Sequence, residues 1–339
     1  MTAPLTVLES FPAPRPTSVN PYTLLLADSI REAGAGLVYF SWKSALTARF
    51  DVFHVHWPEI LVEGRTPARR LVRQALTVLL VARLALLRRP IVRTVHNLGL
   101  PEGLSPLQRG ILRLIDRRTA LRIRLNEHTP VDGPVATIPH AHFRSWFTSY
   151  PPSTPVAGRV GYVGRIRRYK GVETLLEAFA GTRVLAGAGA APDLSARIAG
   201  YASTPELQGA LTEMARGDDR ITIEFGFVSD ATIADVVTSS ELVVLPYRVM
   251  HNSSAAITGL SLDRPVLVPD NEVTRDLAAE VGPGWVHTFE GDLTSESLLA
   301  ALEAVHAAPP TGRPRLDARE WADSGRAHVE AFRTAVARP

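Results

Sequence analysis

Residues 159–179 have the sequence RVGYVGRIRRYKGVETLLEAF, in which a strand pattern gives way to a helix pattern. The apolar residues at 159–163 predict a strand, and Gly164 begins a turn in which the backbone can take conformations closed to other residues. From residue 171 to residue 179 the apolar side chains recur at helical spacing and predict a helix. A strand, a glycine turn and a helix in this order form the repeating unit of a parallel α/β sheet.

The same alternation of strands and helices extends on both sides of this unit. We expect further strands at residues 6–9, 37–40, 51–56, 91–95, 121–125, 135–138, 182–186, 221–225, 242–246, 265–268 and 285–288. We expect helices at residues 22–33, after Pro67, and at residues 105–118, 204–215, 230–239, 254–262, 273–280, 295–307 and 316–336. Such alternation predicts parallel sheets with helices on both faces.

The proline-rich segment at residues 150–155 separates two such runs and predicts a linker. We therefore expect an α/β protein with two doubly wound, Rossmann-like domains, residues 1–150 and residues 151–315. Ligands of such folds bind beyond the carboxyl ends of the strands, so a site in the cleft between the domains is expected. Residues 316–339 should form a C-terminal helix that packs back toward the first domain.

The composition excludes several classes of protein. The chain has 339 residues, of which 45% are hydrophobic and 21% charged, and it has no cysteine. This rules out a disulfide scaffold, a thiolate metal site and a cysteine nucleophile. We see no secretory signal, and the most apolar stretch, residues 71–87, is interrupted by Arg73 and Arg83. We expect a cytoplasmic protein.

The positive charge lies mainly in the first half. Residues 1–157 carry a net charge of +9 and the remainder carries −6. The excess favours an anionic partner such as a membrane surface, a nucleic acid or an acidic substrate, and chance placement is the alternative. Arginines flank residues 71–87, which would suit either a membrane interface or a buried helix. Aromatic residues are not interleaved with these arginines, so we expect no nucleic-acid partner.

The glycine turn after residue 163 is also a candidate phosphate site. Gly164 lets backbone N–H groups approach a ligand, Arg165 and Lys170 flank the loop, and a helix begins at Gly171. Only two of the 37 basic residues are lysines, and Lys170 is one of them. The loop is neither a Walker loop nor a GxGxxG motif, and a solvated basic loop is the alternative.

Several segments together resemble the GT-B glycosyltransferases of the family 4 type. VGR at 163–165 followed by KGVETLLEA at 170–178 is similar to the donor-phosphate signature of that family. GAG at 187–189, FGFVS at 225–229, LVVLPY at 242–247, Ser253-Ser254 and PVLV at 265–268 follow in the family's order. HVHWPE at 54–59 and TVHN at 94–97 resemble bacterial mannosyltransferases that extend lipid-linked oligosaccharides.

The resemblance implies a nucleotide-sugar site in the second domain. The implied donor-binding residues are Gly164, Arg165, Lys170, Gly187, Gly189, Phe227, Tyr247, Ser253, Ser254 and Thr258. The chain departs from the family pattern at two positions where many retaining members carry glutamates, because Met250 and Thr258 stand there. We therefore expect inverting transfer of a sugar, with GDP-mannose as the best candidate donor.

The acceptor side of the site is expected in the first domain. Glu59 is our first choice for the general base and His96 the second, because each follows a predicted strand; helix capping and a structural hydrogen bond are the alternatives. The implied acceptor-binding residues are Asn20, His56, Trp57, Asn97 and His140. The acceptor would be a lipid-linked saccharide or a polysaccharide at the inner membrane face, where the protein would bind peripherally.

We expect neither a metal nor another cofactor. The chain has no DxD triplet, and no third ligand is evident near His54 and His56, which project to the same side of a strand. Two rival hypotheses remain at this point. One is a sugar-nucleotide epimerase of the same fold, and the other is a non-catalytic protein that binds membranes or anions through its basic half.

Overall fold

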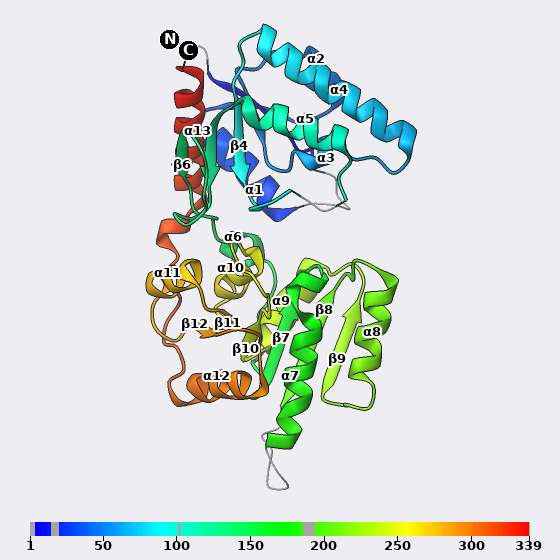
Figure 1. Ribbon diagram of the computed structural model, residues 1–339. Coiled ribbons are helices and arrows are strands. Elements are labelled where there is room, and N and C mark those ends of the chain that lie inside the picture. The colour runs from blue at the N-terminus through cyan, green and yellow to red at the C-terminus, as the bar shows by residue number, and fades with distance from the viewer. Residues whose placement is uncertain (1–3, 15–19, 101–102, 186–193, 339) are drawn as a thin grey trace. The chain divides into compact units, whose positions relative to one another are not determined.

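The computed structural model describes residues 4–14, 20–100, 103–185 and 194–338 (Figure 1). The chain divides into two compact units. Unit 1 comprises Met1–Ala141 together with Ala318–Pro339, and unit 2 comprises His142–Asp317. Each unit contains a six-stranded parallel sheet, so the predicted fold class of two doubly wound α/β domains is confirmed.

The sheet of unit 1 has the strand order β2-β1-β3-β4-β5-β6. Its strands are β1 (Thr6–Glu9), β2 (Gly36–Val38), β3 (Val52–Val55), β4 (Ile91–Val95), β5 (Thr119–Arg124) and β6 (Val135–Thr137). The helices of unit 1 are α1 (Pro21–Glu32), α2 (Trp42–Thr47), α3 (Glu59–Val62), α4 (Pro67–Leu86), α5 (Pro106–Arg117) and α13 (Trp321–Val336). The chain passes from β1 to β2 on one side and returns to β3 on the other, so the order reverses between β1 and β3.

Side-chain alternation along these strands gives the sheet two different faces. Leu8, Phe53 and Ile91 pack into an apolar core with residues of α2 to α5. Glu9 and His54 directly follow Leu8 and Phe53, and Thr94 lies three residues after Ile91, so all three lie on the opposite face, where α13 also packs. That second face is polar at the carboxyl ends of its strands, which is the place where doubly wound sheets bind ligands.

The C-terminal helix α13 belongs to unit 1 and packs against α1. Gly325 lies at the contact, where a Cβ atom would come within 2.3 Å of the Ser29 carbonyl oxygen. The absence of a side chain there lets the two helix backbones approach closely.

The sheet of unit 2 has the strand order β12-β11-β10-β7-β8-β9, which reverses between β10 and β7. Its strands are β7 (Arg159–Val163), β8 (Ser195–Gly200), β9 (Ile221–Phe225), β10 (Leu242–Val244), β11 (Val266–Pro269) and β12 (Val286–Phe289). Its α-helices are α6 (Arg144–Phe147), α7 (Val172–Leu185), α8 (Pro205–Ala215), α9 (Asp230–Ser239), α10 (Ser254–Ser261), α11 (Glu272–Val281) and α12 (Ser295–Ala307). Short 3₁₀ turns lie at Arg168–Lys170 and Asp317–Arg319.

Two sequence predictions differ from the structure. The strand expected at residues 182–186 is wrong, because α7 continues to Leu185 and the neighbouring strand is β8 at Ser195–Gly200. The division between the units lies at residues 141 and 142, ahead of the proline-rich segment. That segment is held to α9 within unit 2, since the Ser153 N–H donates to Thr238 Oγ1 at 2.8 Å and the Ser153 hydroxyl to Asp235 at 2.5 Å.

Candidate active site

In unit 2, the turn that follows β7 is shaped by two glycines. Gly164 has a φ of +133°, and its N–H donates to Ala199 O at 3.1 Å. The Gly164 carbonyl oxygen lies so close to Gly200 that a Cβ atom on Gly200 would be 2.0 Å from it. Gly171 is left-handed, with a φ of +63°, and a Cβ there would come within 2.1 Å of Pro246 O. The turn is therefore packed directly against the neighbouring strand β8 and against the chain that leaves β10, at the point where the strand order reverses.

Lys170 points its ammonium group into this turn. The Nζ atom lies 5.0 Å from the centre of the Tyr247 ring, and a Cβ on Gly164 would lie 3.9 Å from it. Burial lowers the pKa of Lys170 to about 8, and the nearby charges of Arg167 and Arg165 act in the same direction. A partly buried cation next to glycine backbone, with two more cations close by, is suited to bind a diphosphate.

The start of α10 belongs to the same neighbourhood. Burial raises the pKa of the Tyr247 hydroxyl, while the adjacent Ser253 hydroxyl lowers it. Ser253 caps the helix by accepting a hydrogen bond from Ala256 N at 3.2 Å, and Ser254 is the first residue of the helix. Thr258 lies one turn further on and donates its hydroxyl to Ser254 O at 2.8 Å. The helix N-terminus thus adds a partial positive charge beside Tyr247.

The structure gathers Gly164, Lys170, Tyr247 and Ser253, with Arg165 on the exposed side of the turn. Phe227 follows β9 and is 85% exposed. Gly187 and Gly189 lie outside the described residues. The donor-binding roles of all these residues stay predictions.

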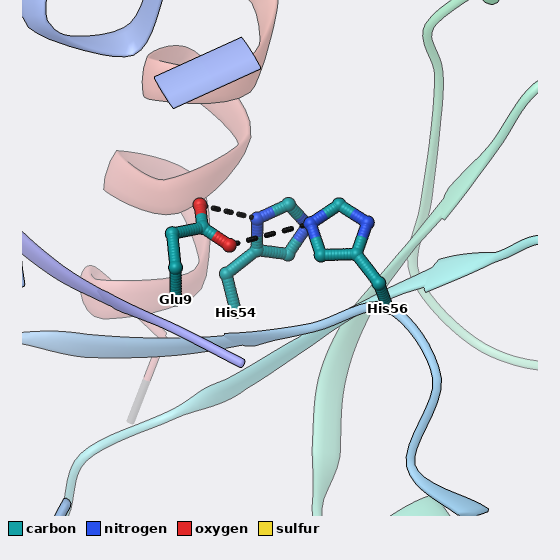
Figure 2. Close-up of side chains that lie close together, drawn as sticks. All are labelled: Glu9, His54 and His56. Atoms are coloured by element: carbon teal, nitrogen blue, oxygen red, sulfur yellow. Dashed lines mark hydrogen bonds and ion pairs between the residues drawn. The ribbon is translucent and has the colours of Figure 1, made fainter. Parts of the chain in front are cut away.

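In unit 1, a buried cluster of polar side chains lies where the strand order reverses. Glu9 at the end of β1 contacts two histidines at the end of β3 (Figure 2). Its carboxylate oxygens lie 2.9 Å from His54 Nδ1 and 3.3 Å from His56 Nε2. His54 Nε2 lies 2.8 Å from the Thr94 hydroxyl of β4, and His56 Nδ1 lies 3.0 Å from His96 Nε2. Glu9, His54 and His56 are almost completely buried, whereas His96 is partly exposed.

Near pH 7 the Glu9 carboxyl group of this cluster is charged, and four of the surrounding histidines are neutral. Burial alone would raise the pKa of Glu9, but the charges and hydrogen bonds of His54 and His56 hold it at about 2. Burial lowers the pKa of His56 to about 4, that of His140 to about 4 and that of His328 to about 3. Burial, with the neighbouring histidines, also lowers the pKa of His96 well below its usual range.

An aromatic group covers the outer end of the cluster. The Tyr22 ring of α1 lies 5.5 Å from His96 and 4.9 Å from His140, measured between ring centres. Trp57 stacks on His96 at 4.5 Å with an interplanar angle of 19°. The structure thus brings together His56, Trp57, His96 and His140, which the sequence assigns to the acceptor side.

The other acceptor-side predictions lie at the edge of this group or outside it. Asn20 caps α1 by accepting a hydrogen bond from Tyr22 N at 3.1 Å, which makes the helix-capping alternative correct for its side chain. Asn97 is exposed in the loop after β4. Glu59 begins α3, and burial raises its pKa, while Arg93 lowers it. Arg93 bonds Asp116 of α5, so the charges near Glu59 lie on the face of the sheet opposite the histidines.

A third potential ligand lies next to His54 and His56, so the expectation that none is nearby is wrong. Glu9 supplies a carboxylate, and one ligand atom from each of the three residues lies within 4.8 Å of the others. A carboxylate and two imidazoles are donors that suit Zn²⁺ or a similar ion. In the structure the two imidazoles are each hydrogen-bonded to the Glu9 carboxylate.

Sequence reasoning missed Glu9, Tyr22, Thr94, Trp321 and His328. The sequence offers one indication of Glu9, which is a charged residue in an apolar strand. It offers no indication of Trp321 and His328, because these residues of α13 reach the cluster only when the chain folds. The Trp321 ring then lies 5.8 Å from Tyr22, and the His328 ring lies 5.6 Å from His54. Among the described helices, none combines the length and the apolarity needed to span a membrane.

Comparisons with known proteins place this geometry in a family. A family described as glycosyl transferases group 1 matches residues 157–305. The chain is 39% identical over 333 residues to GDP-mannose:glycolipid 4-beta-D-mannosyltransferase of Xanthomonas campestris pv. campestris, covering 98% of this chain and 93% of that protein.

Solved structures show the same fold at low sequence identity. Anabaena Alr3699/HepE in complex with UDP-glucose is similar with a TM-score of 0.61 at 14% identity, over 98% of each chain. The catalytic domain of starch synthase IV from Arabidopsis thaliana, bound to ADP and acarbose, is similar with a TM-score of 0.64 at 10% identity, over 99% of each chain. The GT-B resemblance is therefore confirmed, and the chain belongs to the group 1 glycosyl transferases, enzymes that transfer a sugar from a nucleotide donor.

Proposed function

We propose that this enzyme transfers mannose from GDP-mannose to a glycolipid acceptor with inversion at the anomeric carbon and without a metal. The 39% identity over nearly the whole chain to an enzyme named for that donor and a glycolipid supports the choice of substrates. The name of the relative gives a β-linkage, and GDP-mannose is an α-glycosyl phosphate. One direct displacement converts the α-donor into a β-product.

Unit 2 supplies the groups that stabilise the leaving diphosphate. The observation that carries this assignment is the partly buried ammonium group of Lys170 next to the backbone of Gly164. As the C1–O bond breaks, its electron pair moves to a phosphate oxygen, and the added negative charge is stabilised by Lys170, Arg165 and the N-terminus of α10. These groups take the role that a divalent metal plays in other transferases.

Unit 1 supplies the group that deprotonates the acceptor hydroxyl. Of the two candidates, we assign this role to His96, because it lies among His56, Trp57, Tyr22 and His140. The pKa of Glu59 responds instead to Arg93, which bonds Asp116 on the opposite face of the sheet. His96 is neutral near pH 7, which is the state a general base requires.

The substrates are tested by ligand binding and product analysis. We expect GDP to raise the melting temperature of the protein, and UDP, ADP and dTDP to raise it less, because a ligand that binds only the folded state stabilises it. With GDP-mannose and a glycolipid fraction from bacterial membranes, the product should be a β-mannoside by NMR. An α-mannoside would refute inversion, and a preference for another nucleotide would refute the assigned donor.

We also propose that unit 1 binds the anionic surface of a membrane through α4, which would make the enzyme peripheral on the inner face. One side of α4 packs into the core, as the alternative of a buried helix requires, but the other side exposes Leu71, Val72, Val78, Leu79 and Leu86. We call these five residues the α4 apolar face. Arg69 and Arg70 precede it and Arg88 follows it, all exposed. Apolar side chains with arginines at both ends suit insertion among anionic headgroups.

Vesicle sedimentation tests this surface. The protein should bind vesicles of equal parts phosphatidylglycerol and phosphatidylcholine more than vesicles of phosphatidylcholine alone, and salt should weaken the binding. The double variant Leu71→Glu, Leu79→Glu should lose binding, whereas Val156→Glu, at an exposed apolar residue of unit 2, should keep it. Equal loss in both variants, or none in the double variant, would refute the assignment.

A further inference from the structure

The buried carboxylate of Glu9 is connected to His96 through one intervening histidine. Glu9 Oε2 lies 3.3 Å from His56 Nε2, and His56 Nδ1 lies 3.0 Å from His96 Nε2. The second carboxylate oxygen lies 2.9 Å from His54 Nδ1, and His54 continues to the Thr94 hydroxyl at 2.8 Å. Two branches therefore leave Glu9, one through His54 to Thr94 and one through His56 to His96.

The direction of each hydrogen bond follows from the chemistry of the carboxylate. An ionised carboxylate only accepts, so the ring nitrogen of each facing histidine carries a hydrogen. His56 is neutral near pH 7, so with its hydrogen on Nε2 its Nδ1 must be an acceptor. His96 then donates from Nε2 to His56, and Nδ1 becomes the basic nitrogen of the His96 ring.

Burial gives this chain of hydrogen bonds its strength. Glu9 is fully buried and His56 is 2% exposed, so water does not compete for the bonds between them. His96 is the member of the chain that is partly exposed. When His96 takes up a proton, its bond to His56 becomes charge-assisted, and the negative charge of Glu9 favours the cation.

We propose that Glu9 is a positioning residue, which acts through His56 to hold His96 in the Nε2–H tautomer with Nδ1 as the proton acceptor. This proposal rests on the proposed role of His96 as general base. In the step, the acceptor O–H bond breaks and its proton moves to His96 Nδ1 while the new C1–O bond forms. The C1–O bond to the diphosphate breaks with its electron pair on the phosphate, and solvent later takes the proton from His96.

Glu9→Gln tests the proposal with little change in shape. The amide presents an N–H on one side, so one of the two histidine bonds has to reverse. Reversal at His56 moves its hydrogen to Nδ1, which makes His96 Nε2 an acceptor and its Nδ1 the protonated nitrogen. Reversal at His54 leaves these tautomers in place but still removes the negative charge that favours the His96 cation. We expect kcat to fall about 100- to 10 000-fold, the range that a general base contributes, while the KM for GDP-mannose and the affinity for GDP stay unchanged.

Thr94→Val is the matched control. Thr94 is as buried as Glu9 and bonds the same cluster, but it lies on the branch through His54. We expect its kcat to stay within about threefold of the wild type, since the path to His96 is intact. An equal loss of kcat in both variants would show a general structural effect and would overturn the proposal.

A measurement on the wild-type protein keeps the test independent of folding defects. Nitrogen-15 NMR of histidine side chains distinguishes the two neutral tautomers, and His96→Gln identifies the His96 signals. We expect the Nε2–H tautomer for His96. The Nδ1–H tautomer would overturn the proposal, as would a stoichiometric metal ion found by elemental analysis, because a metal on Glu9, His54 and His56 requires His56 Nε2 to be bare.

These outcomes separate the positioning role of Glu9 from the proposed function. If the wild type transfers mannose and Glu9→Gln does so equally well, the positioning role fails and the function stands. If the wild type transfers no mannose from GDP-mannose, the proposed function fails. The tautomer of His96 still decides, in that case, whether Glu9 orients it.

Discussion

The charge of Lys170 should control the pH dependence of donor use. Its pKa lies at about 8 because the side chain is partly buried and faces Arg167 and Arg165. The protonated form, to which we assign binding of the diphosphate, is therefore present below pH 8 and lost above it. About 90% of Lys170 is charged at pH 7 and about 10% at pH 9, so kcat/KM for GDP-mannose should fall about tenfold between these values.

The assay is the initial rate of mannosyl transfer at saturating acceptor, measured from pH 6.5 to pH 9.5. kcat/KM reports the titration of the free enzyme, so binding of the donor does not shift the value it gives. Lys170→Arg is the control, because arginine stays charged over this range and any titration of the nucleotide affects both proteins alike. Its profile should be flatter than that of the wild type, whatever its absolute rate.

Lys170→Met gives the size of the contribution. A hydrogen bond to a charged group contributes about 1.5 to 3 kcal/mol, so GDP should bind about 10- to 150-fold more weakly. A parallel decline of the wild type and Lys170→Arg between pH 7 and pH 9 would refute the reasoning. Unchanged affinity for GDP in Lys170→Met would refute the assigned contact.

Three further predictions concern single residues. Gly164→Ala should fold but bind GDP at least about tenfold more weakly in calorimetry, because a φ of +133° strains any other residue and the turn must shift. Burial lowers the pKa values of His56 and His328 to about 4 and about 3, so below pH 6.5 the unfolded chain binds more protons than the folded one. Lowering the pH from 6.5 toward 4 should therefore reduce the free energy of unfolding, measured in urea, by up to about 1.4 kcal/mol per pH unit for each histidine. The variant His328→Asn should show a smaller dependence on pH. Gly325→Val should lower the free energy of unfolding by about 1 to 3 kcal/mol, because its Cβ would press on Ser29 O, whereas Gly110→Ala, with open space around it, should not lower it.

Most strands could be predicted because they are short apolar runs between glycines or prolines. The strand β8 was missed, since its sequence SARIAG contains small residues and an arginine and lacks a continuous apolar run. The error at residues 182–186 has the opposite origin, because a short apolar run at the end of α7 was interpreted as a strand. The sequence VLA follows helical residues directly, and nothing local marks the helix as longer than residue 179.

The candidate residues of unit 2 and those of unit 1 differ in how far the sequence predicts them. Gly164 and Lys170 lie in one short turn, so local order reveals them. The histidine cluster draws Glu9, His54, Thr94 and His328 from four elements that lie up to 319 residues apart. His54 and His56 were recognisable as a pair, but the carboxylate between them depends on the parallel pairing of β1 with β3.

The return of the chain to unit 1 has a consequence for biosynthesis. The helix that carries Trp321 and His328 is made only after the whole of unit 2, residues 142–317. At about 5 to 20 residues per second, translation of that stretch takes roughly 9 to 35 s, and during this time the sheet of β1 to β6 lacks α13. Unit 2 is complete first. A chain that ends before residue 321 would thus contain all of unit 2 but lack Trp321 and His328, and the face of the unit 1 sheet that α13 packs against would be uncovered.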